Sequence, residues 1–170
     1  LKIEGGECRL LRPGGISVEA IEKFTPVIQA SPQDPDSHES PGLLKSHYAP
    51  WTPFALFEGS PVDFVKELQE LEKFLKEKKL LFPRLGLLSL CEKPKTSLLE
   101  AVEILSEKKD LYEAASNLFQ VIRKLDKMHL DLIVALKMPR EGIGLAIMDR
   151  IERASFGRKG LRDFFENWKR

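Results

Sequence analysis

Short and almost uninterrupted apolar runs in the second half of the chain restrict its fold more than any other feature. Residues 85–90 read Leu-Gly-Leu-Leu-Ser-Leu, and Asp131 is followed by Leu-Ile-Val-Ala-Leu. Runs of this length without polar alternation are typical of strands in a parallel sheet, because helices cover both faces of such a sheet. Amphipathic segments separate the runs, so we expect a parallel sheet flanked by helices.

The order of the elements expected after Trp51 is that of an α/β domain. Helical segments are recognised by apolar side chains at three- and four-residue steps, and Pro61 marks a helix start. Strands are expected at residues 53–58, 85–90, 101–105 and 131–136, and helices at residues 61–76, 110–125 and 142–154. We therefore predict an α/β fold, with a Rossmann-like and mostly parallel sheet flanked by helices, over residues 51–160.

One edge of this sheet is the expected place for a ligand, because ligands of open parallel sheets bind beyond the carboxyl ends of the strands. The turns at this edge follow Glu58, Leu90, Ser106 and Pro139. The last turn, residues 140–146, resembles a phosphate-binding turn but lacks the third glycine of the dinucleotide fingerprint. Close packing of the helix on the sheet is the other interpretation of its glycines.

The first 50 residues have two different compositions. Residues 1–24 alternate short apolar runs with glycine turns, and Ser17 followed by Glu19 is a helix-start signal. A strand, a tight turn and a short helix are expected there. Residues 25–50 contain five prolines and few large apolar residues. Such a stretch cannot bury a core, so we expect an extended linker.

The overall composition excludes several functions. The chain carries 27 Lys and Arg against 26 Asp and Glu, which argues against a general polyanion-binding surface but leaves a local basic groove open. Cys8 and Cys91 match no metal spacing, and the three histidines share none either, so no metal site is expected. No apolar run approaches the length of a membrane span, so we expect a cytoplasmic protein without a membrane partner.

The segment Ser40-Pro-Gly-Leu-Leu-Lys-Ser-His-Tyr-Ala-Pro places chemically capable side chains inside the linker. Pro41 and Pro50 each fix φ, remove a backbone donor and favour extended geometry in the residue before them. Lys45, His47 and Tyr48 stand between these two prolines. Loops held by a rigid scaffold are where binding residues concentrate, although a plain linker with an incidental His-Tyr pair is the other interpretation.

Three blocks of sequence stand in a characteristic order and spacing. They are Leu10-Leu-Arg-Pro-Gly-Gly-Ile-Ser, then Ser40-Pro-Gly with His47-Tyr-Ala-Pro, then Gly142-Ile-Gly-Leu-Ala-Ile-Met-Asp-Arg-Ile-Glu-Arg-Ala. The middle block looks like the linker motif of the two-domain threonylcarbamoyl-AMP synthases, within the wider YrdC/YciO-type family. The first block is similar to the end of the catalytic domain of that family, and the last resembles the final helix of its C-terminal domain.

The resemblance implies how the chain is organised. Residues 1–24 would be the end of a YrdC-like α/β catalytic domain, and residues 25–50 the linker. Residues 51–160 would be the C-terminal α/β domain, followed by a tail at residues 161–170. The catalytic pockets would lie before Leu1, so no catalytic residue is expected in this chain and the fragment alone is expected to be inactive.

The resemblance also implies a reaction and its ligands. The complete enzyme would be a nucleotidyltransferase that condenses L-threonine, bicarbonate and ATP to threonylcarbamoyl-AMP and diphosphate, with Mg²⁺ at the phosphates. This product serves the threonylcarbamoyl modification (t6A) of adenosine beside the tRNA anticodon. ATP, L-threonine and bicarbonate would bind through the YrdC-like domain, and tRNA or the transferase proteins of the t6A pathway are candidate partners.

Two residues of this chain match family positions that lie beside ATP. They are Arg12, in the Leu-Arg-Pro-Gly turn, and Tyr48 of the linker. Four more residues would shape the linker as it closes over the pocket, namely Pro41, Gly42, Lys45 and His47. The chain departs from the family at Leu43-Leu44, where Met-Lys is frequent, and at Asp149, where Asn is common.

A function of another class stays open at this point. The chain would then be an autonomous α/β module that binds a nucleotide or tRNA at the strand-end edge, without catalysis. Tight binding of ATP or tRNA by the isolated chain would favour this alternative.

Overall fold

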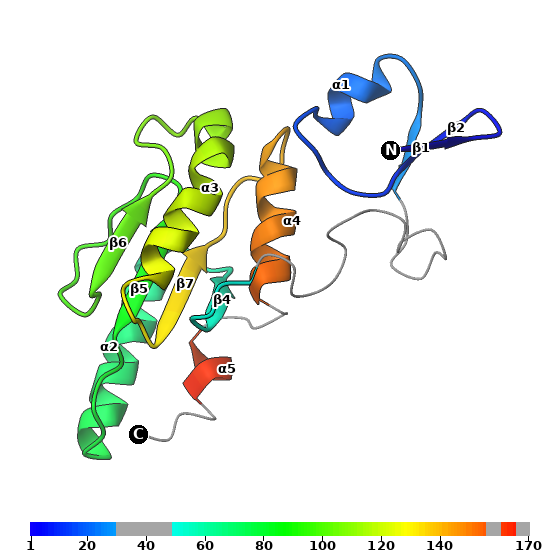
Figure 1. Cartoon of the computed structure of the whole chain (residues 1–170). Helices are drawn as coiled ribbons and strands as arrows, with labels where there is room; N and C mark the ends of the chain where they lie inside the picture. Colours follow the sequence, from blue (N-terminus) through cyan, green and yellow to red (C-terminus); the bar gives the residue numbers. More distant parts are fainter. Residues whose placement is uncertain (30–48, 156–160, 166–170) are drawn as a thin grey trace.

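The computed structural model describes residues 1–29, 49–155 and 161–165, and the predicted linker residues 30–48 lie outside these ranges. The described residues form a three-stranded sheet at the N-terminus and a four-stranded sheet in the larger part of the chain (Figure 1). The larger sheet and its helices correspond to the predicted α/β domain.

The four-stranded sheet is parallel throughout. It contains β4 (Phe54–Phe57), β5 (Leu85–Ser89), β6 (Ala101–Ile104) and β7 (Leu132–Leu136) in the order β4-β7-β5-β6. Every neighbouring pair in this order is parallel. The prediction of a mostly parallel sheet is therefore confirmed, and all four strands end at the same edge.

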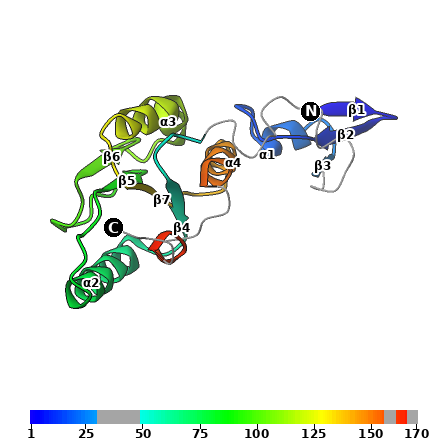
Figure 2. The ribbon, with the colours of Figure 1, turned by 60° about the horizontal axis from the view of Figure 1, so that its bottom comes forward.

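Helices cover both faces of this sheet. Figure 2 shows α3 (Leu111–Asp126) and α4 (Gly144–Ser155) on one face, with α2 (Pro61–Glu77) and the short α5 (Arg162–Phe165) on the other. α2, α3 and α4 correspond to the helices predicted at residues 61–76, 110–125 and 142–154. α5 lies in the stretch predicted as a tail, and its own residues Phe164 and Phe165 pack against the core layer under α2.

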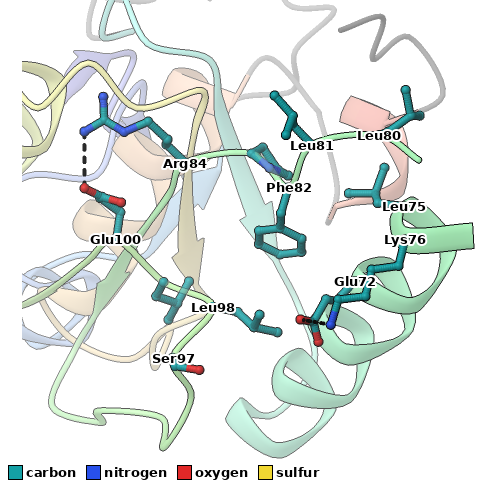
Figure 3. A pocket seen from close by; sticks show the side chains of 12 residues that line it. Glu72, Leu75, Lys76, Leu80, Leu81, Phe82, Arg84, Ser97, Leu98 and Glu100 are labelled. Carbon is teal, nitrogen blue, oxygen red and sulfur yellow. Dashed lines mark hydrogen bonds and ion pairs between the residues drawn. The ribbon is translucent and has the colours of Figure 1, made fainter. Parts of the chain in front are cut away.

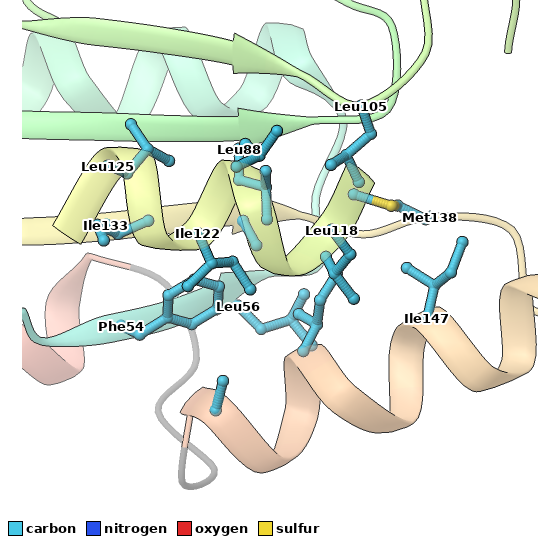
Figure 4. Close-up of a cluster of buried hydrophobic side chains, with 14 of the residues drawn as sticks. Phe54, Leu56, Leu88, Leu105, Leu118, Ile122, Leu125, Ile133, Met138 and Ile147 are labelled. Carbon is cyan, nitrogen blue, oxygen red and sulfur yellow. The ribbon is translucent and has the colours of Figure 1, made fainter. Parts of the chain in front are cut away.

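The core consists of two layers, because successive strand residues point to opposite faces of the sheet. Phe54 of β4 and Ile133 of β7 enter the layer under α3 and α4, which is shown in Figure 4. Their neighbours Ala55 and Val134 enter the layer under α2. All four side chains are almost completely buried. This burial on both sides explains why the strands lack polar alternation.

Helix starts are fixed by local side-chain caps. In α2, Ser60 accepts a hydrogen bond from the Asp63 backbone N–H at 3.2 Å, and the Asp63 carboxylate accepts one from the Ser60 backbone N–H at 3.2 Å. The Ser60 hydroxyl also donates to the Asp63 carboxylate at 2.6 Å, and this hydrogen bond, followed by that from the Ser60 backbone N–H, lowers the pKa of Asp63. α3 begins after Asp110, whose carboxylate accepts from the backbone N–H groups of Tyr112 and Glu113. Such caps satisfy donors that the first helical turn leaves unpaired.

The N-terminal unit contains β1 (Lys2–Glu4), β2 (Glu7–Leu10), α1 (Val18–Glu22) and β3 (Val27–Gln29). β1 and β2 form a hairpin through Gly5 and Gly6, where a single strand was predicted. Ser17 caps α1 as predicted, accepting from the Ala20 backbone N–H at 3.2 Å. β3 pairs with β2 in parallel register, so part of the predicted linker, which was expected to begin at residue 25, belongs to this sheet.

We predict that Leu125→Ala lowers the free energy of unfolding by about 2–5 kcal/mol, because it opens a cavity in the layer beneath α3. Leu125 is fully buried, whereas Leu81 is 79% exposed and provides a matched leucine control. Leu81→Ala is expected to change the free energy by about 0.5 kcal/mol or less. Chemical denaturation of both variants measures the difference, and equal losses would contradict this description of the core.

Candidate functional site

The structure places one of the six predicted site residues. Arg12 lies within the described part of the chain, in the turn that follows β2. The other five, Pro41, Gly42, Lys45, His47 and Tyr48, lie outside the described residues. Arg12 is therefore the predicted site residue whose surroundings the structure describes.

Arg12 faces α4 of the C-terminal domain. Its Nε atom lies 3.4 Å from Oδ2 of Asp149, and the two side chains are only 12% and 15% exposed. Ion pairs sheltered from water interact more strongly than exposed ones, because the effective dielectric constant is lower. This pair joins residues that are far apart in the sequence and ties the N-terminal unit to α4.

Two further arginines of α4 surround Asp149. Arg153, one helical turn later, places Nε and Nη2 each 2.9 Å from Oδ1 of Asp149. The Nη1 atom of Arg150 lies 4.0 Å from Oδ2 of Asp149. The same atom donates to the carbonyl oxygen of Ala146 at 2.7 Å and to that of Pro13 at 3.3 Å. We call Arg12, Asp149, Arg150 and Arg153 the arginine cluster. Its three guanidinium groups and one carboxylate leave the junction cationic.

A small cavity of about 150 Å³ adjoins the cluster. Its lining combines the glycine turn of the N-terminal unit with the facing sides of α3 and α4. The residues that line it are Gly14, Gly15, Ala115, Leu118, Ile143, Ala146, Ile147 and Arg150. The walls are mainly apolar and the volume is small. We therefore interpret the cavity as incomplete packing between the N-terminal unit and helices α3 and α4.

Glu19 lies in the first turn of α1, where nearby polar groups favour its ionised form. The pKa of Glu19 is lowered by its own backbone N–H, by the Ser17 hydroxyl and also by the backbone N–H of Gly142, against an opposing effect of burial. Gly142 has φ +55°, in the left-handed region that favours glycine.

Gly144 in the turn at residues 140–146 is required for packing. A Cβ atom at this position would collide with the Pro139 carbonyl and press against Leu111 of α3. This finding supports the packing interpretation of the glycine.

At the carboxyl ends of the strands, polar side chains form hydrogen bonds within the loops that carry them. Ser89 accepts a hydrogen bond from the Glu92 backbone N–H at 3.1 Å. Ser106 accepts from the Asp110 backbone N–H at 2.9 Å and donates to Glu113. Both serines are 2% exposed, so their hydroxyl groups stabilise the turns and do not reach a substrate.

Asp126, the last residue of α3, holds the backbone that leads into β4. Its Oδ2 accepts from the Trp51 backbone N–H at 3.3 Å, and its Oδ1 accepts from the Thr52 backbone N–H at 2.8 Å. A carboxylate at the last residue of a helix is unfavourable in the field of the helix dipole. Two backbone donors offset this cost here. The indole of Trp51 is 98% exposed although its backbone is held.

A larger cavity, of about 440 Å³, lies at the amino ends of β5 and β6, opposite the edge expected to bind a ligand. Figure 3 shows Phe82, Leu75 and Leu98 within it, with charged residues at its rim. These charged residues pair with each other, Arg84 with Glu100 at 3.3 Å and Glu72 with Lys76 at 2.7 Å. Its chemistry is that of a shallow apolar groove and does not favour a triphosphate.

The described residues contain neither a metal-binding cluster nor a membrane-spanning helix. Across residues 1–29, 49–155 and 161–165, no three His, Cys, Asp or Glu side chains come together in a way that would hold a metal ion. Among the helices that the structure describes, none combines the length and the apolar character needed to cross a membrane.

The fold and the junction define a class of protein. It is a Rossmann-like α/β domain whose helix α4 binds the turn that contains Arg12. The family described as "Threonylcarbamoyl-AMP synthase, C-terminal domain" matches residues 16–155. The chain therefore belongs to this family of C-terminal domains.

Curated relatives carry the name of the whole enzyme. Threonylcarbamoyl-AMP synthase of Bacillus subtilis is 35% identical over 152 residues, covering 88% of this chain and 42% of the relative. The synthase of Pyrococcus abyssi is 32% identical over 151 residues, covering 86% of this chain and 42% of the relative. The chain thus spans about two fifths of the length of these relatives.

Solved structures agree with this assignment. The structure of Pyrococcus abyssi Sua5 complexed with L-threonine superposes with a TM-score of 0.71 at 30% identity, covering 89% of this chain and 43% of the other. A variant of the same protein, with a histidine and the tyrosine after it both replaced by alanine, gives a TM-score of 0.70 at 28% identity, covering 89% and 42%. The predicted family and fold class are confirmed.

Most of the junction was missed by reasoning from the sequence. Asp149 was noted only as a departure from the family, and its pairing with Arg12 was not predicted. The spacing of Asp149 and Arg153 signals an ion pair within one helix. Nothing local in the sequence indicates that Arg12 and Pro13 meet the same helix. Asp126 was missed for the same reason.

We predict that Asp126→Ala destabilises the protein by about 1–3 kcal/mol, because two backbone N–H groups lose their acceptor. Amide hydrogen exchange at Trp51 and Thr52 should accelerate in this variant. Asp126→Asn retains an oxygen acceptor and should have a smaller effect on both quantities. Unchanged exchange at Thr52 in the alanine variant would contradict the assigned contact.

We predict a pH-dependent effect of Glu19→Gln. The pKa of Glu19 in the folded chain lies below its ordinary value of 4.5, so the ionised carboxylate stabilises the fold above that pH. This contribution is lost as the pH falls through the folded-state pKa. The variant should be less stable than the wild type at about pH 7, and the difference should shrink at about pH 3.

Chemical denaturation at both pH values measures this effect, with Glu22→Gln on the same helix as the control for removal of one charge. A stability difference between Glu19→Gln and the wild type that is equal at both pH values would contradict the prediction.

Proposed function

We propose that this chain is the C-terminal domain, with its gating linker, of an L-threonylcarbamoyladenylate synthase. The complete protein would condense L-threonine, bicarbonate and ATP to threonylcarbamoyl-AMP, diphosphate and water, for t6A modification of tRNA. The observation that carries the proposal is the family match over residues 16–155 combined with coverage of 42% of the synthase from Bacillus subtilis. The isolated chain would then lack the catalytic pockets.

The division of the chain follows the same proposal. Residues 1–24 would end the YrdC-like catalytic domain, residues 25–50 would be the linker, and residues 51–160 the C-terminal domain. The pairing of β3 with β2 supports an extension of the first unit to Gln29. The contacts of Arg12 and Pro13 with α4 support a fixed docking of the two units.

Arg12 and Tyr48 are proposed to lie beside ATP. A guanidinium offers planar donors to phosphate oxygens, and tyrosine offers a ring for the base and a hydroxyl. The cationic character of the arginine cluster supports a polyanionic ligand near Arg12. His47-Tyr48 is the only His-Tyr pair in this chain, and the alanine variant of the Pyrococcus abyssi protein replaces such a pair.

The linker is proposed to act as a gate over the catalytic pocket. Pro41 and Gly42 would set its turn, and Lys45 and His47 would contact the pocket as it closes. Closure would shield the labile carbamate and adenylate intermediates from water. L-Threonine is named as the bound ligand of the Pyrococcus abyssi structure, which supports the same substrate here.

The remaining ligands are assigned to the rest of the protein. We assign Mg²⁺ to the YrdC-like domain, where the resemblance places the phosphates of ATP. A cytoplasmic location and contacts with tRNA or with t6A-pathway transferases belong to the same proposal.

We predict that Tyr48→Ala in the complete synthase slows formation of threonylcarbamoyl-AMP by roughly tenfold or more, through loss of a contact to ATP. Tyr112→Ala is the matched control, because Tyr112 is the other tyrosine of the chain and is 65% exposed on α3. The isolated chain should release no diphosphate from ATP and should bind ATP and tRNA weakly. Tight binding of either ligand by the isolated chain would favour the autonomous module.

A further inference from the structure

We propose that Asp149 is a positioning residue for Arg12, so that the C-terminal domain holds the guanidinium that the synthase presents to ATP. This inference rests on the proposed function, in which Arg12 lies beside ATP. It adds a task for the C-terminal domain other than carrying the linker, and it assigns that task to a single side chain of α4.

The sheltered geometry of the pair supports a positioning role. The Arg12 and Asp149 side chains are 12% and 15% exposed, whereas Arg84 and Glu100, which pair at 3.3 Å elsewhere in the domain, are 48% and 51% exposed. An exposed pair contributes little, because water and salt screen it and both side chains remain mobile. The Arg12–Asp149 pair is subject to much less screening and restricts both side chains.

Asp149 is itself held in place. Two nitrogen atoms of Arg153 lie 2.9 Å from its Oδ1 atom, which leaves Oδ2 directed at Arg12. The carboxylate therefore bridges one arginine of its own helix and one arginine of the N-terminal unit. A side chain that is fixed by a neighbour in this way can orient a third group, as supporting residues do in preorganised sites.

The backbone next to Arg12 is held by the same helix. Arg150, adjacent to Asp149, donates to the carbonyl oxygen of Pro13 at 3.3 Å. Two successive residues of α4 thus contact two successive residues of the turn. Asp149 pairs with the side chain of Arg12, and Arg150 donates to the backbone of Pro13. This arrangement fixes both the position of the turn and the direction of the Arg12 side chain.

The chemistry of the guanidinium explains why its orientation matters. Its five N–H donors lie in one plane and match phosphate oxygens in a fixed geometry. A carboxylate 3.4 Å from Nε restricts this plane through charge attraction, whereas an arginine without such a partner samples many rotamers. We therefore expect loss of Asp149 to weaken ATP recognition through Arg12 and to leave threonine recognition unchanged.

The experiment is a double-mutant cycle in the complete synthase that contains this chain. Diphosphate release is measured while ATP and L-threonine are titrated in turn. Arg12→Ala is expected to raise KM for ATP by about tenfold or more, and Asp149→Ala by about three- to tenfold. KM for threonine should change by less than about twofold in both variants. The double variant should resemble Arg12→Ala, because Asp149 acts through Arg12.

The control is Glu100→Ala, which removes an ion pair of the same domain at the opposite edge of the sheet and should leave KM for ATP unchanged. Asp149→Asn keeps an oxygen acceptor and should restore part of the ATP affinity. If Asp149→Ala unfolds, the cycle is run with Asp149→Asn, whose effect must likewise disappear in the Arg12→Ala background.

The possible results distinguish the positioning role of Asp149 from the proposed location of Arg12 beside ATP. An effect of Arg12→Ala with none of Asp149→Ala overturns the positioning role and leaves the proposed function standing. Additive effects in the double variant also overturn it, because Asp149 would then act independently of Arg12. An unchanged KM for ATP in Arg12→Ala removes Arg12 from the ATP site and the inference with it.

Discussion

The two-sided burial of β7 is the constraint on which the rest of the domain depends. This strand pairs with β4 on one side and β5 on the other, and every residue from Leu132 to Leu136 is buried. Its side chains alternate between the two core layers, so α3 and α4 are needed on one face and α2 on the other. Once both layers are filled, the positions of the helix ends follow, and with them the direction in which α4 presents Asp149 to the N-terminal unit.

Features governed by nearby residues were predictable from the sequence. Unbroken apolar runs identified β5 and β7 as buried parallel strands, and Ser17 marked the start of α1. β3 was missed, because Val27–Gln29 follows Pro26 and its only strong signal is a partner strand in the same sheet. Arg12 was identified through a resemblance, but its pairing with Asp149 arises from tertiary packing. No periodicity or local propensity encodes a contact between residues so far apart.

The junction between the two units combines unlike kinds of interaction. Arg12 and Asp149 supply a sheltered ion pair, and Arg150 donates to the backbone carbonyl of Pro13. The small cavity beside these contacts shows that apolar packing is less complete here than in the core. Polar contacts therefore fix the relative position of the two units, with less help from hydrophobic burial than a domain interior receives.

The anchoring of Trp51 and Thr52 by Asp126 has a consequence for the linker that precedes them. β3 fixes one end of the segment at Gln29, and the Asp126 carboxylate fixes the other end just after Pro50. The two anchors belong to different units, because Gln29 is held by a strand of the N-terminal sheet and Trp51 by the last residue of α3. A change at either anchor would therefore alter the span between Gln29 and Trp51 without touching the intervening residues.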